Sequence, residues 1–320
     1  MIEVKNLTKR YGHHLAVDHL NFTVESGKIY GFLGPNGAGK STTMNIMTGY
    51  LGATEGQVLI DGHDILKEPE EAKKNIGYLP EIPPLYMEMT VREYLEFAAE
   101  LKGIKKDKRE PQIEEVIRLA KLRDVENRLI QNLSKGYKQR VGLAQAVLGF
   151  PEIIILDEPT VGLDPKQIIE IRELIRKLAK KHTVILSSHI LAEVREVCDY
   201  IMIISGGKLV ASDTTENLEN MMSGKDQIEV EAKASRDEMD HIIRRTGKIK
   251  EVKYRTSASG ITTAQIIAKG GEDIREELFL AFSHADVPML TLNQSKTTLE
   301  EIFLELTQGS GTVSYTHLRA

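Results

Sequence analysis

The stretch Gly34-Pro-Asn-Gly-Ala-Gly-Lys-Ser-Thr42 decides the fold of the first part of this chain. It contains the spacing G-x-x-x-x-G-K-S, which is typical of a loop that wraps around phosphate groups. Its glycines allow backbone conformations that a Cβ atom would forbid, so N–H groups can converge on phosphate oxygens. The apolar segment Lys28–Leu33 predicts a buried strand before the loop, and Thr42–Thr48, closed by Gly49, predicts a helix after it. Strand, loop and helix in this order predict a nucleoside triphosphate site at the helix N-terminus.

The individual residues of this loop have separate expected tasks. Lys40 is expected to reach the β- and γ-phosphates, and the Ser41 hydroxyl is expected to hold Mg²⁺. The candidate nucleotide-binding residues are Gly34, Pro35, Asn36, Gly37, Ala38, Gly39, Lys40, Ser41 and Thr42.

A pair of acidic residues follows a second apolar segment, Ile153–Leu156. A strand there would carry Asp157 to the edge of the sheet beside the phosphate loop, where its carboxylate can hold Mg²⁺ directly or through water. Because side chains alternate along a strand, Glu158 is expected to point away from Asp157, towards the place of an attacking water. Glu158 is therefore the candidate general base.

These motifs, taken in order, resemble the ATP-binding cassette (ABC) family, and specifically the nucleotide-binding subunits of ABC-2-type exporters. The resemblance covers Ile2 to about Ser212. Leu133–Arg140, which reads Leu-Ser-Lys-Gly-Tyr-Lys-Gln-Arg, resembles the signature motif that separates this family from other P-loop ATPases. Val161–Asp164 resembles its D-loop, and Ser187–His189 resembles the segment that carries its switch histidine.

The resemblance implies roles for several residues, with ATP and Mg²⁺ as the ligands. Two nucleotide-binding domains would dimerise head to tail, so that Ser134 and Gly136 of one subunit touch the γ-phosphate of ATP held by the other. Tyr11 would stack on adenine, and His189 would contact the γ-phosphate in its own subunit, as a catalytic residue beside the base. Asp164, by itself an ordinary turn acid, would belong to the D-loop.

The sequence departs from the family pattern at two places. Lys135 and Tyr137 stand where the signature has its first glycine and its glutamine, while Ser134 and Gly136 are kept. Glu81 stands where the family has a glutamine that helps to hold Mg²⁺. Glu81 keeps one oxygen ligand but adds a negative charge, and the alternative interpretation is a surface acid in a loop.

The expected fold class is α/β: a P-loop NTPase cassette with a mixed sheet, an antiparallel β subdomain and a helical insertion. Alternating or β-rich segments predict the antiparallel subdomain, apolar segments after helices predict parallel strands, and apolar residues at helical spacing predict the insertion. The segments of the antiparallel subdomain are Ile2–Leu7, Leu15–Glu25 and Gln57–Asp61. The predicted parallel strands are Ile76–Leu79, Ile153–Leu156, Val184–Ser187 and Tyr200–Ile204. The helical insertion is predicted from Val91–Leu101 and Ile113–Ala120.

The pattern changes after about Ser223. Strands and helices follow in the order βαββαβ, which predicts a small α+β module of the ferredoxin-like type. The predicted elements are Gln227–Ala232, Asp237–Arg245, Lys250–Arg255, Thr262–Lys269, Asp273–Ser283 and Pro288–Leu292, with a last helix opening at Thr298–Glu301. The expected domains are an ATP-binding domain at 1–222 and an accessory module at 225–307. Residues 309–320 resemble translated read-through sequence and are expected to be a non-native tail.

Composition limits the class of partner. The chain has 320 residues and a formal charge of −5, and it has no basic footprint for nucleic acid. No apolar run approaches the roughly 18 residues of a membrane span, and the N-terminus has no signal-peptide character. The single cysteine fits a reducing cytosol. These features predict a cytoplasmic chain, and the resemblance to exporter subunits implies that it is peripheral on the inner face of the cell membrane. His13, His14, His63 and His182 have no metal-ligand spacing and are expected to be solvated.

The leading hypothesis is an ATPase subunit of an ABC-2-type exporter, which drives transmembrane permease subunits on separate chains. The partner cassette could be identical or different, giving a homodimer or a heterodimer. Glu81–Val91, which is apolar and bears methionines, resembles the surface that receives the permease's coupling helix; ordinary packing of the insertion is the alternative. The competing function is a soluble, non-transport ABC ATPase that acts in cofactor assembly or as a regulatory scaffold.

Overall fold

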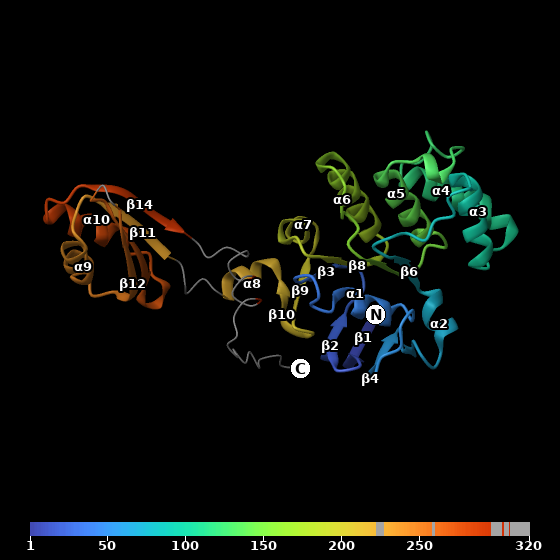
Figure 1. Ribbon diagram of the computed structural model, residues 1–320, viewed down its shortest axis with the longest axis horizontal. Coiled ribbons are helices and arrows are strands. Elements are labelled where there is room, and N and C mark those ends of the chain that lie inside the picture. Colours follow the sequence, from blue (N-terminus) through green and yellow to red (C-terminus); the bar gives the residue numbers. More distant parts are fainter. Residues whose placement is uncertain (222–226, 258–259, 296–302, 304–306, 308–320) are drawn as a thin grey trace. The chain divides into compact units, whose positions relative to one another are not determined.

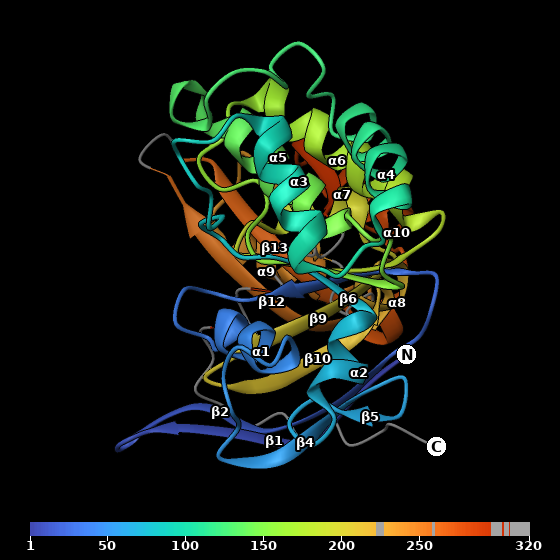
Figure 2. The same cartoon turned by 90° about the vertical axis from the view of Figure 1, so that its right-hand side faces the viewer.

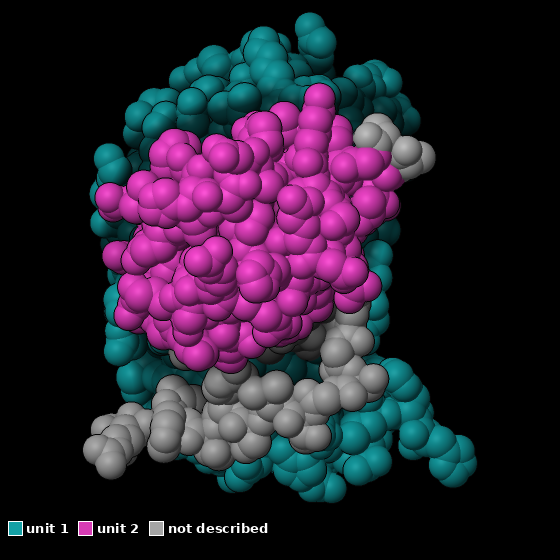
Figure 3. Space-filling model, turned by 90° about the vertical axis from the view of Figure 1, so that its left-hand side faces the viewer, with its two compact units in different colours: residues 1–215 teal, residues 216–320 magenta. Residues whose placement is uncertain are grey.

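The computed structural model describes residues 1–221, 227–257, 260–295, 303 and 307. The chain forms two compact units, Met1–Thr215 and Glu216–Ala320, which are coloured separately in Figure 3. The boundary lies several residues before the expected one, because the chain leaves the sheet of the first unit at the end of β10 (Lys208–Thr214). The helix α8 (Thr215–Met221) follows at once.

An antiparallel sheet forms one end of the first unit. Its strands are β1 (Ile2–Tyr11), β2 (His14–Val24), β4 (Glu55–Ile60) and β5 (His63–Asp64), in the order β2-β1-β4-β5. Alternate side chains of these strands, such as Ile2 and Val4, are buried in the core of the unit. The predicted antiparallel β subdomain is confirmed.

The second sheet of this unit is mostly parallel and has the order β10-β9-β3-β8-β7-β6. The further strands are β3 (Ile29–Leu33), β6 (Ile76–Leu79), β7 (Ile153–Leu156), β8 (Thr183–Ser188) and β9 (Tyr200–Ser205). Every residue of β3, β7 and β8 is buried, as expected for a sheet covered on both faces. Because these strands run parallel, the loops that follow Leu33, Leu156 and Ser188 start from the same edge.

The helical insertion lies at the end of the unit opposite the antiparallel sheet (Figures 1 and 2). It contains α3 (Val91–Leu101), α4 (Lys106–Leu119), a 3₁₀ turn at Ile130–Asn132 and α5 (Lys135–Val147). The helices α1 (Lys40–Met47), α2 (Pro69–Lys74), α6 (Pro165–Ala179) and α7 (Leu191–Val197) complete the unit. A capping box at Thr90 starts α3. At its other end, Lys102 Nζ donates hydrogen bonds to the carbonyls of Gln145, Ala146 and Leu148, which ties α3 to the end of α5.

The second unit has the predicted order of elements. They are β11 (Gln227–Ala232), α9 (Arg236–Arg244), β12 (Ile249–Thr256), β13 (Thr262–Ala268), a 3₁₀ turn at Lys269–Gly271, α10 (Arg275–His284) and β14 (Met289–Ser295). The sheet order β12-β13-β11-β14, antiparallel throughout, is that of a ferredoxin-like module. Ile243, Ile266 and Phe282 are buried between helices and sheet. The helix predicted to open at Thr298 and the tail at 309–320 lie outside the described residues.

Within the described ranges, no helix is long and apolar enough to cross a membrane. The expectation that His182 is solvated is wrong, because this side chain is buried immediately before β8. Its Nδ1 hydrogen-bonds the Pro151 carbonyl oxygen at 2.6 Å, and its ring stacks on Phe150.

Candidate nucleotide-binding site

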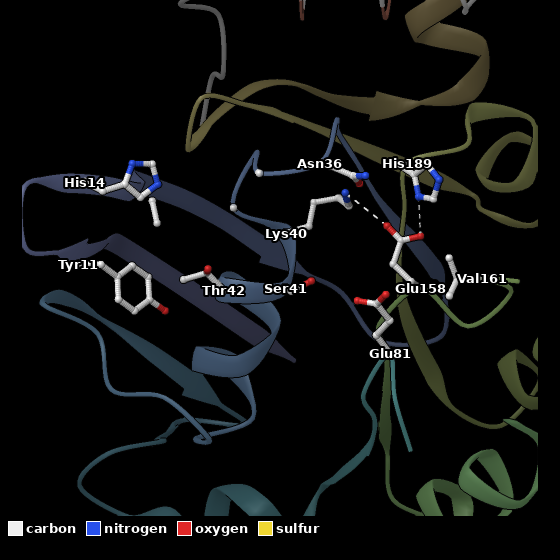
Figure 4. A pocket seen from close by; sticks show the side chains of 13 residues that line it. Tyr11, His14, Asn36, Lys40, Ser41, Thr42, Glu81, Glu158, Val161 and His189 are labelled. Carbon is white, nitrogen blue, oxygen red and sulfur yellow. Dashed lines mark hydrogen bonds and ion pairs between the residues drawn. The ribbon is translucent and has the colours of Figure 1, made fainter. Parts of the chain in front are cut away.

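A cavity of about 400 Å³ opens at the edge of the parallel sheet where the phosphate loop begins (Figure 4). Residues of β1 and β2 line it, together with the phosphate loop, the start of α1 and the segments that follow β6, β7 and β8. The lining residues are Tyr11, His14, Ala16, Asn36, Gly37, Gly39, Lys40, Ser41, Thr42, Glu81, Glu158, Val161 and His189. The structure therefore brings most of the predicted nucleotide-binding residues to one concave surface, with Glu81, Glu158 and His189 among them.

The loop from Gly34 to Gly39 has the backbone conformation that the glycine pattern predicts. Gly37 has φ +80° and Gly39 has φ +103°, values that side chains with a Cβ rarely adopt. A Cβ at Gly39 would also lie 2.5 Å from the Ala16 carbonyl oxygen, so the loop passes close under β2. The backbone thus forms a cradle at the N-terminus of α1, a place whose free N–H groups and dipole suit a phosphate group.

Lys40 is the buried cation of this cradle. Its Nζ donates a hydrogen bond to the Gly34 carbonyl oxygen at 2.8 Å and lies 3.4 Å from Glu158 Oε1. On the other side of the same carboxylate, His189 Nδ1 lies 2.9 Å from Glu158 Oε2. Because an ionised carboxylate can only accept, His189 is the donor. Lys40 at the start of α1, Glu158 after β7 and His189 after β8 therefore form one chain of contacts, drawn as dashed lines in Figure 4.

Glu158 does diverge from Asp157, but not for the predicted reason. β7 ends at Leu156, so strand alternation does not reach the acidic pair. Glu158 instead has φ +47°, in the left-handed region, and its N–H donates to Ser187 Oγ at 2.9 Å. Such a conformation costs roughly 1–3 kcal/mol and persists where the surrounding structure holds it. This turn directs the Glu158 side chain into the cavity.

Asp157 is buried behind the cavity lining. It accepts hydrogen bonds from Ser41 Oγ at 3.2 Å and from Ser187 Oγ at 2.5 Å. Ser187 therefore supports both acids, since its hydroxyl donates to Asp157 and accepts from the Glu158 N–H. From the sequence, Ser187 was predicted only to belong to the Ser-Ser-His segment that resembles the one with the switch histidine. Leu186, the residue before Ser187, pairs with Leu156 in the neighbouring parallel strand, and this register, which places Ser187 beside Asp157, was the signal that could have indicated this role.

The donors near the phosphate loop fit Mg²⁺ bound together with a nucleotide. In the described part of the chain, no cluster of three or more His, Cys, Asp or Glu side chains could hold a metal by itself. Mg²⁺ usually takes one or two carboxylates and completes its shell with phosphate oxygens and water. The Ser41 hydroxyl and the Asp157 carboxylate meet this requirement at the start of α1, and Glu81 lines the same cavity from the loop after β6.

Tyr11 and His14 face the other end of the cavity. They are paired across the turn of the β1–β2 hairpin, and Tyr11 is 48% exposed. Lys9 Nζ lies 5.3 Å from the centre of the Tyr11 ring. His14, Ala16 and Val161 also line the cavity, although no sequence motif had indicated them as site residues. The hairpin turn at Gly12 was the signal that would have placed His14 opposite Tyr11.

The signature residues lie apart from this cavity, at the N-terminus of α5. Ser134 is the N-cap of the helix and accepts a hydrogen bond from the Tyr137 N–H at 3.4 Å. Lys135 is exposed, whereas Gly136 is buried because the Gln167 side chain covers it; a Cβ there would lie 2.5 Å from that side chain. The Tyr137 hydroxyl donates to Asp124 at 2.6 Å, which raises the pKa of Tyr137.

The D-loop residue Asp164 is the N-cap of α6. Its carboxylate accepts a hydrogen bond from the Gln167 N–H at 2.9 Å. This N-cap hydrogen bond gives Asp164 a structural role within a single chain. The same Gln167 covers Gly136, so the D-loop and the signature motif are held together at the ends of two neighbouring helices.

The geometry defines a class of protein, a P-loop ATPase with a helical insertion between β6 and β7. Comparison with known proteins agrees. Residues 17–161 match the family model described as ABC transporter. Over 212 residues the chain is 44% identical to the bacitracin transport ATP-binding protein BcrA of Bacillus licheniformis, covering 66% of this chain and 68% of that protein. Over 308 residues it is 31% identical to the linearmycin resistance ATP-binding protein LnrL of Bacillus subtilis (strain 168), and this match covers 96% of this chain and 98% of that protein.

Solved structures show the same relationship for the first unit. An ATP-binding subunit of an ABC transporter has a TM-score of 0.64 at 32% identity, over 69% of this chain and 93% of that one. A dimeric, post-hydrolysis ATP-binding cassette bound to ADP and Pi has a TM-score of 0.61 at 28% identity, over 67% and 98%. The chain belongs to the ABC transporter family, as one of its ATP-binding proteins, and it is an ATPase.

Proposed function

We propose that this chain is the ATP-hydrolysing subunit of an ABC-2-type membrane exporter. ATP would close a head-to-tail pair of cassettes, hydrolysis would reopen the pair, and the motion would drive separate transmembrane permease subunits. The observation that carries this proposal is the chain of contacts from buried Lys40 through buried Glu158 to the partly exposed His189, beside a loop suited to phosphate. The names of the relatives, which concern bacitracin transport and linearmycin resistance, support an exporter over a cofactor-assembly or regulatory scaffold.

Lys40 would bind the β- and γ-phosphates of ATP. Its ammonium pairs with Glu158 in the structure, and a triphosphate is a second anion for the same ammonium. ATP would therefore replace the Glu158 carboxylate as the partner of Lys40, which leaves that carboxylate free to accept a proton from the attacking water. His189 would contact the γ-phosphate from the loop after β8, and Tyr11 would stack on adenine.

Mg²⁺ would be held by Ser41 and Asp157, with Glu81 as a further oxygen ligand. When bound, the ion neutralises charge on the phosphate oxygens. The Ser187 hydroxyl keeps the Asp157 carboxylate directed towards Ser41. Glu81 is exposed and adds negative charge to the cavity, so it would bind the ion without needing a buried partner.

A second cassette would complete the site. The signature residues Ser134 to Tyr137 do not line the cavity of their own chain in the described structure, which supports a contact in trans. The N-terminus of α5, with Ser134 as its N-cap, offers a favourable dipole end to the γ-phosphate of the other subunit. The second cassette can be a copy of this chain or a related one, and Asp164 would lie between the two sites.

The permease would bind at the segment Glu81–Val91. Three large apolar side chains of this segment are exposed: Ile82 at 83%, Tyr86 at 52% and Met87 at 39%. They precede α3, and Lys102 at the end of α3 hydrogen-bonds the end of α5. A movement of this surface would therefore be transmitted through α3 to α5, the helix that begins at the signature residues. A chain bound in this way would be peripheral on the cytoplasmic face of the membrane.

The test begins with the reading frames next to the gene, where we expect a multi-spanning permease. Co-expression of that permease with the full chain should bring the chain into the membrane fraction and stimulate its ATPase activity. Ile82→Glu should abolish both effects and leave basal ATP hydrolysis unchanged, because the Ile82 side chain is exposed and does not line the cavity. Leu66→Glu, at another exposed apolar side chain, is the matched control. Basal hydrolysis without permease-dependent membrane association would contradict the exporter function and leave the ATPase intact.

A further inference from the structure

Glu193 is a buried carboxylate that the proposed reaction does not use. It lies on α7 and is 7% exposed. Its Oε2 accepts two hydrogen bonds, one from Thr160 Oγ1 at 2.5 Å and one from Ser188 Oγ at 3.1 Å. Among the ion pairs of the described residues, none includes Glu193. A carboxylate buried without a cation is costly unless its hydrogen bonds compensate, so this arrangement needs an explanation.

The two hydroxyls that contact Glu193 lie close in the chain to the two candidate catalytic residues. Thr160 follows Glu158 by two positions in the loop after β7, and Ser188 directly precedes His189 at the end of β8. Ser188 Oγ also accepts a hydrogen bond from the Ile190 N–H at 3.0 Å, which fixes the turn on the other side of His189. One carboxylate oxygen therefore joins the loop of the candidate base to the loop of the switch histidine.

The Glu158 turn depends on such supports. Its positive φ is unfavourable, and the turn is closed by a hydrogen bond from the Val161 N–H to the Glu158 carbonyl at 3.1 Å. Ser187 holds the start of this turn through the Glu158 N–H, and Glu193 holds its end through Thr160. Both supports come from β8 and α7. The separation of Glu158 Oε2 from His189 Nδ1 is thus set by contacts outside the cavity.

We propose that Glu193 is a positioning residue for ATP hydrolysis. It holds the turn at Glu158–Val161 against Ser188–Ile190. Glu158 and His189 therefore keep their relative position when the triphosphate replaces Glu158 as the partner of Lys40. This inference rests on the proposed roles of Glu158 and His189. Glu193 itself touches neither nucleotide nor water in the reaction. A displacement of about 1 Å at a reacting group can lower a rate by roughly 100-fold, so a link of this kind has a measurable effect.

The decisive experiment measures ATPase kinetics of the full chain for Glu193→Ala and Glu193→Gln. Glu193→Ala should lower kcat by about tenfold or more and leave KM for ATP within about twofold, because the phosphate cradle is untouched. Glu193→Gln should retain kcat within about threefold, because its amide oxygen can accept the same two hydrogen bonds. The matched control is Glu196→Ala on the same helix, where the side chain is 59% exposed and pairs with Arg172; its kcat should be unchanged.

A second pair of variants separates the bridge from a general packing role. Thr160→Val removes one donor to Glu193 and keeps the shape of the side chain, and it should lower kcat by several-fold. The double variant with Glu193→Ala should be no slower than Glu193→Ala alone within about twofold, because both changes break one link. Independent packing effects would instead multiply. Thermal unfolding of each variant shows that the comparison is made on folded protein.

The inference is overturned if Glu193→Ala keeps wild-type kcat, if Glu193→Gln is as slow as Glu193→Ala, or if the loss appears in KM alone. If Glu193→Ala fails to fold, Thr160→Val still tests the inference. An unchanged kcat for Thr160→Val would show that the contact between Thr160 and Glu193 does not contribute to ATP hydrolysis. Glu158→Gln is measured beside these variants. If Glu158→Gln keeps its turnover, the proposed role of Glu158 fails; if Glu158→Gln is inactive but Thr160→Val is not impaired, only the role of Glu193 fails.

Discussion

Lys40 and Glu158 form an ion pair inside the first unit, with Nζ 3.4 Å from Oε1 and with side chains that are only 5% and 9% exposed. A pair with so little contact with water is poorly screened by salt. Removing one partner leaves the other as an uncompensated buried charge. The pair therefore connects nucleotide binding to stability, and the first two predictions concern its two members.

Lys40→Ala should abolish nucleotide binding, because it deletes the charge that would meet the β- and γ-phosphates. It should also lower the free energy of unfolding by about 3 kcal/mol, since Glu158 loses its buried cation. Titration with a fluorescent ATP analogue and urea unfolding measure the two effects. Lys28→Ala, at an exposed lysine that pairs with Glu25, is the control for both. Micromolar ATP binding by Lys40→Ala would contradict the role of the lysine.

Glu158→Gln should abolish steady-state ATP hydrolysis and leave ATP binding intact. The amide cannot take a proton from water, whereas the phosphate cradle and Asp157 are unchanged. ATP should then hold two subunits together, which size exclusion with Mg-ATP would detect as a doubling of the mass. Turnover within a few-fold of the wild type would exclude Glu158 as the base.

Mixing two inactive variants tests the trans site. Ser134→Arg damages the signature and Lys40→Ala damages the cradle, so a head-to-tail heterodimer of the two keeps one composite site intact. We expect partial recovery of hydrolysis in the mixture, compared with either variant alone. Subunit exchange is shown separately with differently tagged chains. If exchange occurs and the mixture stays inactive, the sites are not shared between subunits.

A chain that ends at Ser223 should still bind ATP. The residues that line the cavity all belong to the first unit, and the second unit has its own buried core. We expect unchanged ATP affinity together with weaker dimerisation or weaker coupling to the permease, because a folded module beside a dimerising ATPase adds surface for assembly. Nucleotide titration and analytical ultracentrifugation measure these quantities. Loss of ATP binding in a truncated chain that is still folded by circular dichroism would place the module in the catalytic unit.

The sequence by itself determined the order and identity of the elements. The strands Ile76–Leu79, Ile153–Leu156 and Gln227–Ala232 were predicted with their observed bounds, because short apolar or alternating segments between turn residues are local signals. The phosphate loop was equally clear, since its glycines, Lys40 and Ser41 are adjacent in the chain. The resemblance to ABC cassettes rested on motifs of the same local kind.

The tertiary structure decided how residues from separate loops meet. Parallel strands bring the ends of β3, β7 and β8 to one edge, and the contacts of Lys40 with Glu158 and of Glu193 with Thr160 follow from that edge. No spacing in the sequence encodes these distances. The direction of Glu158 likewise comes from a left-handed turn held by Ser187, a hydroxyl on another strand, and not from the alternation that its own segment suggested. Local patterns specify elements because their causes are local, whereas a site built from several loops depends on long-range packing.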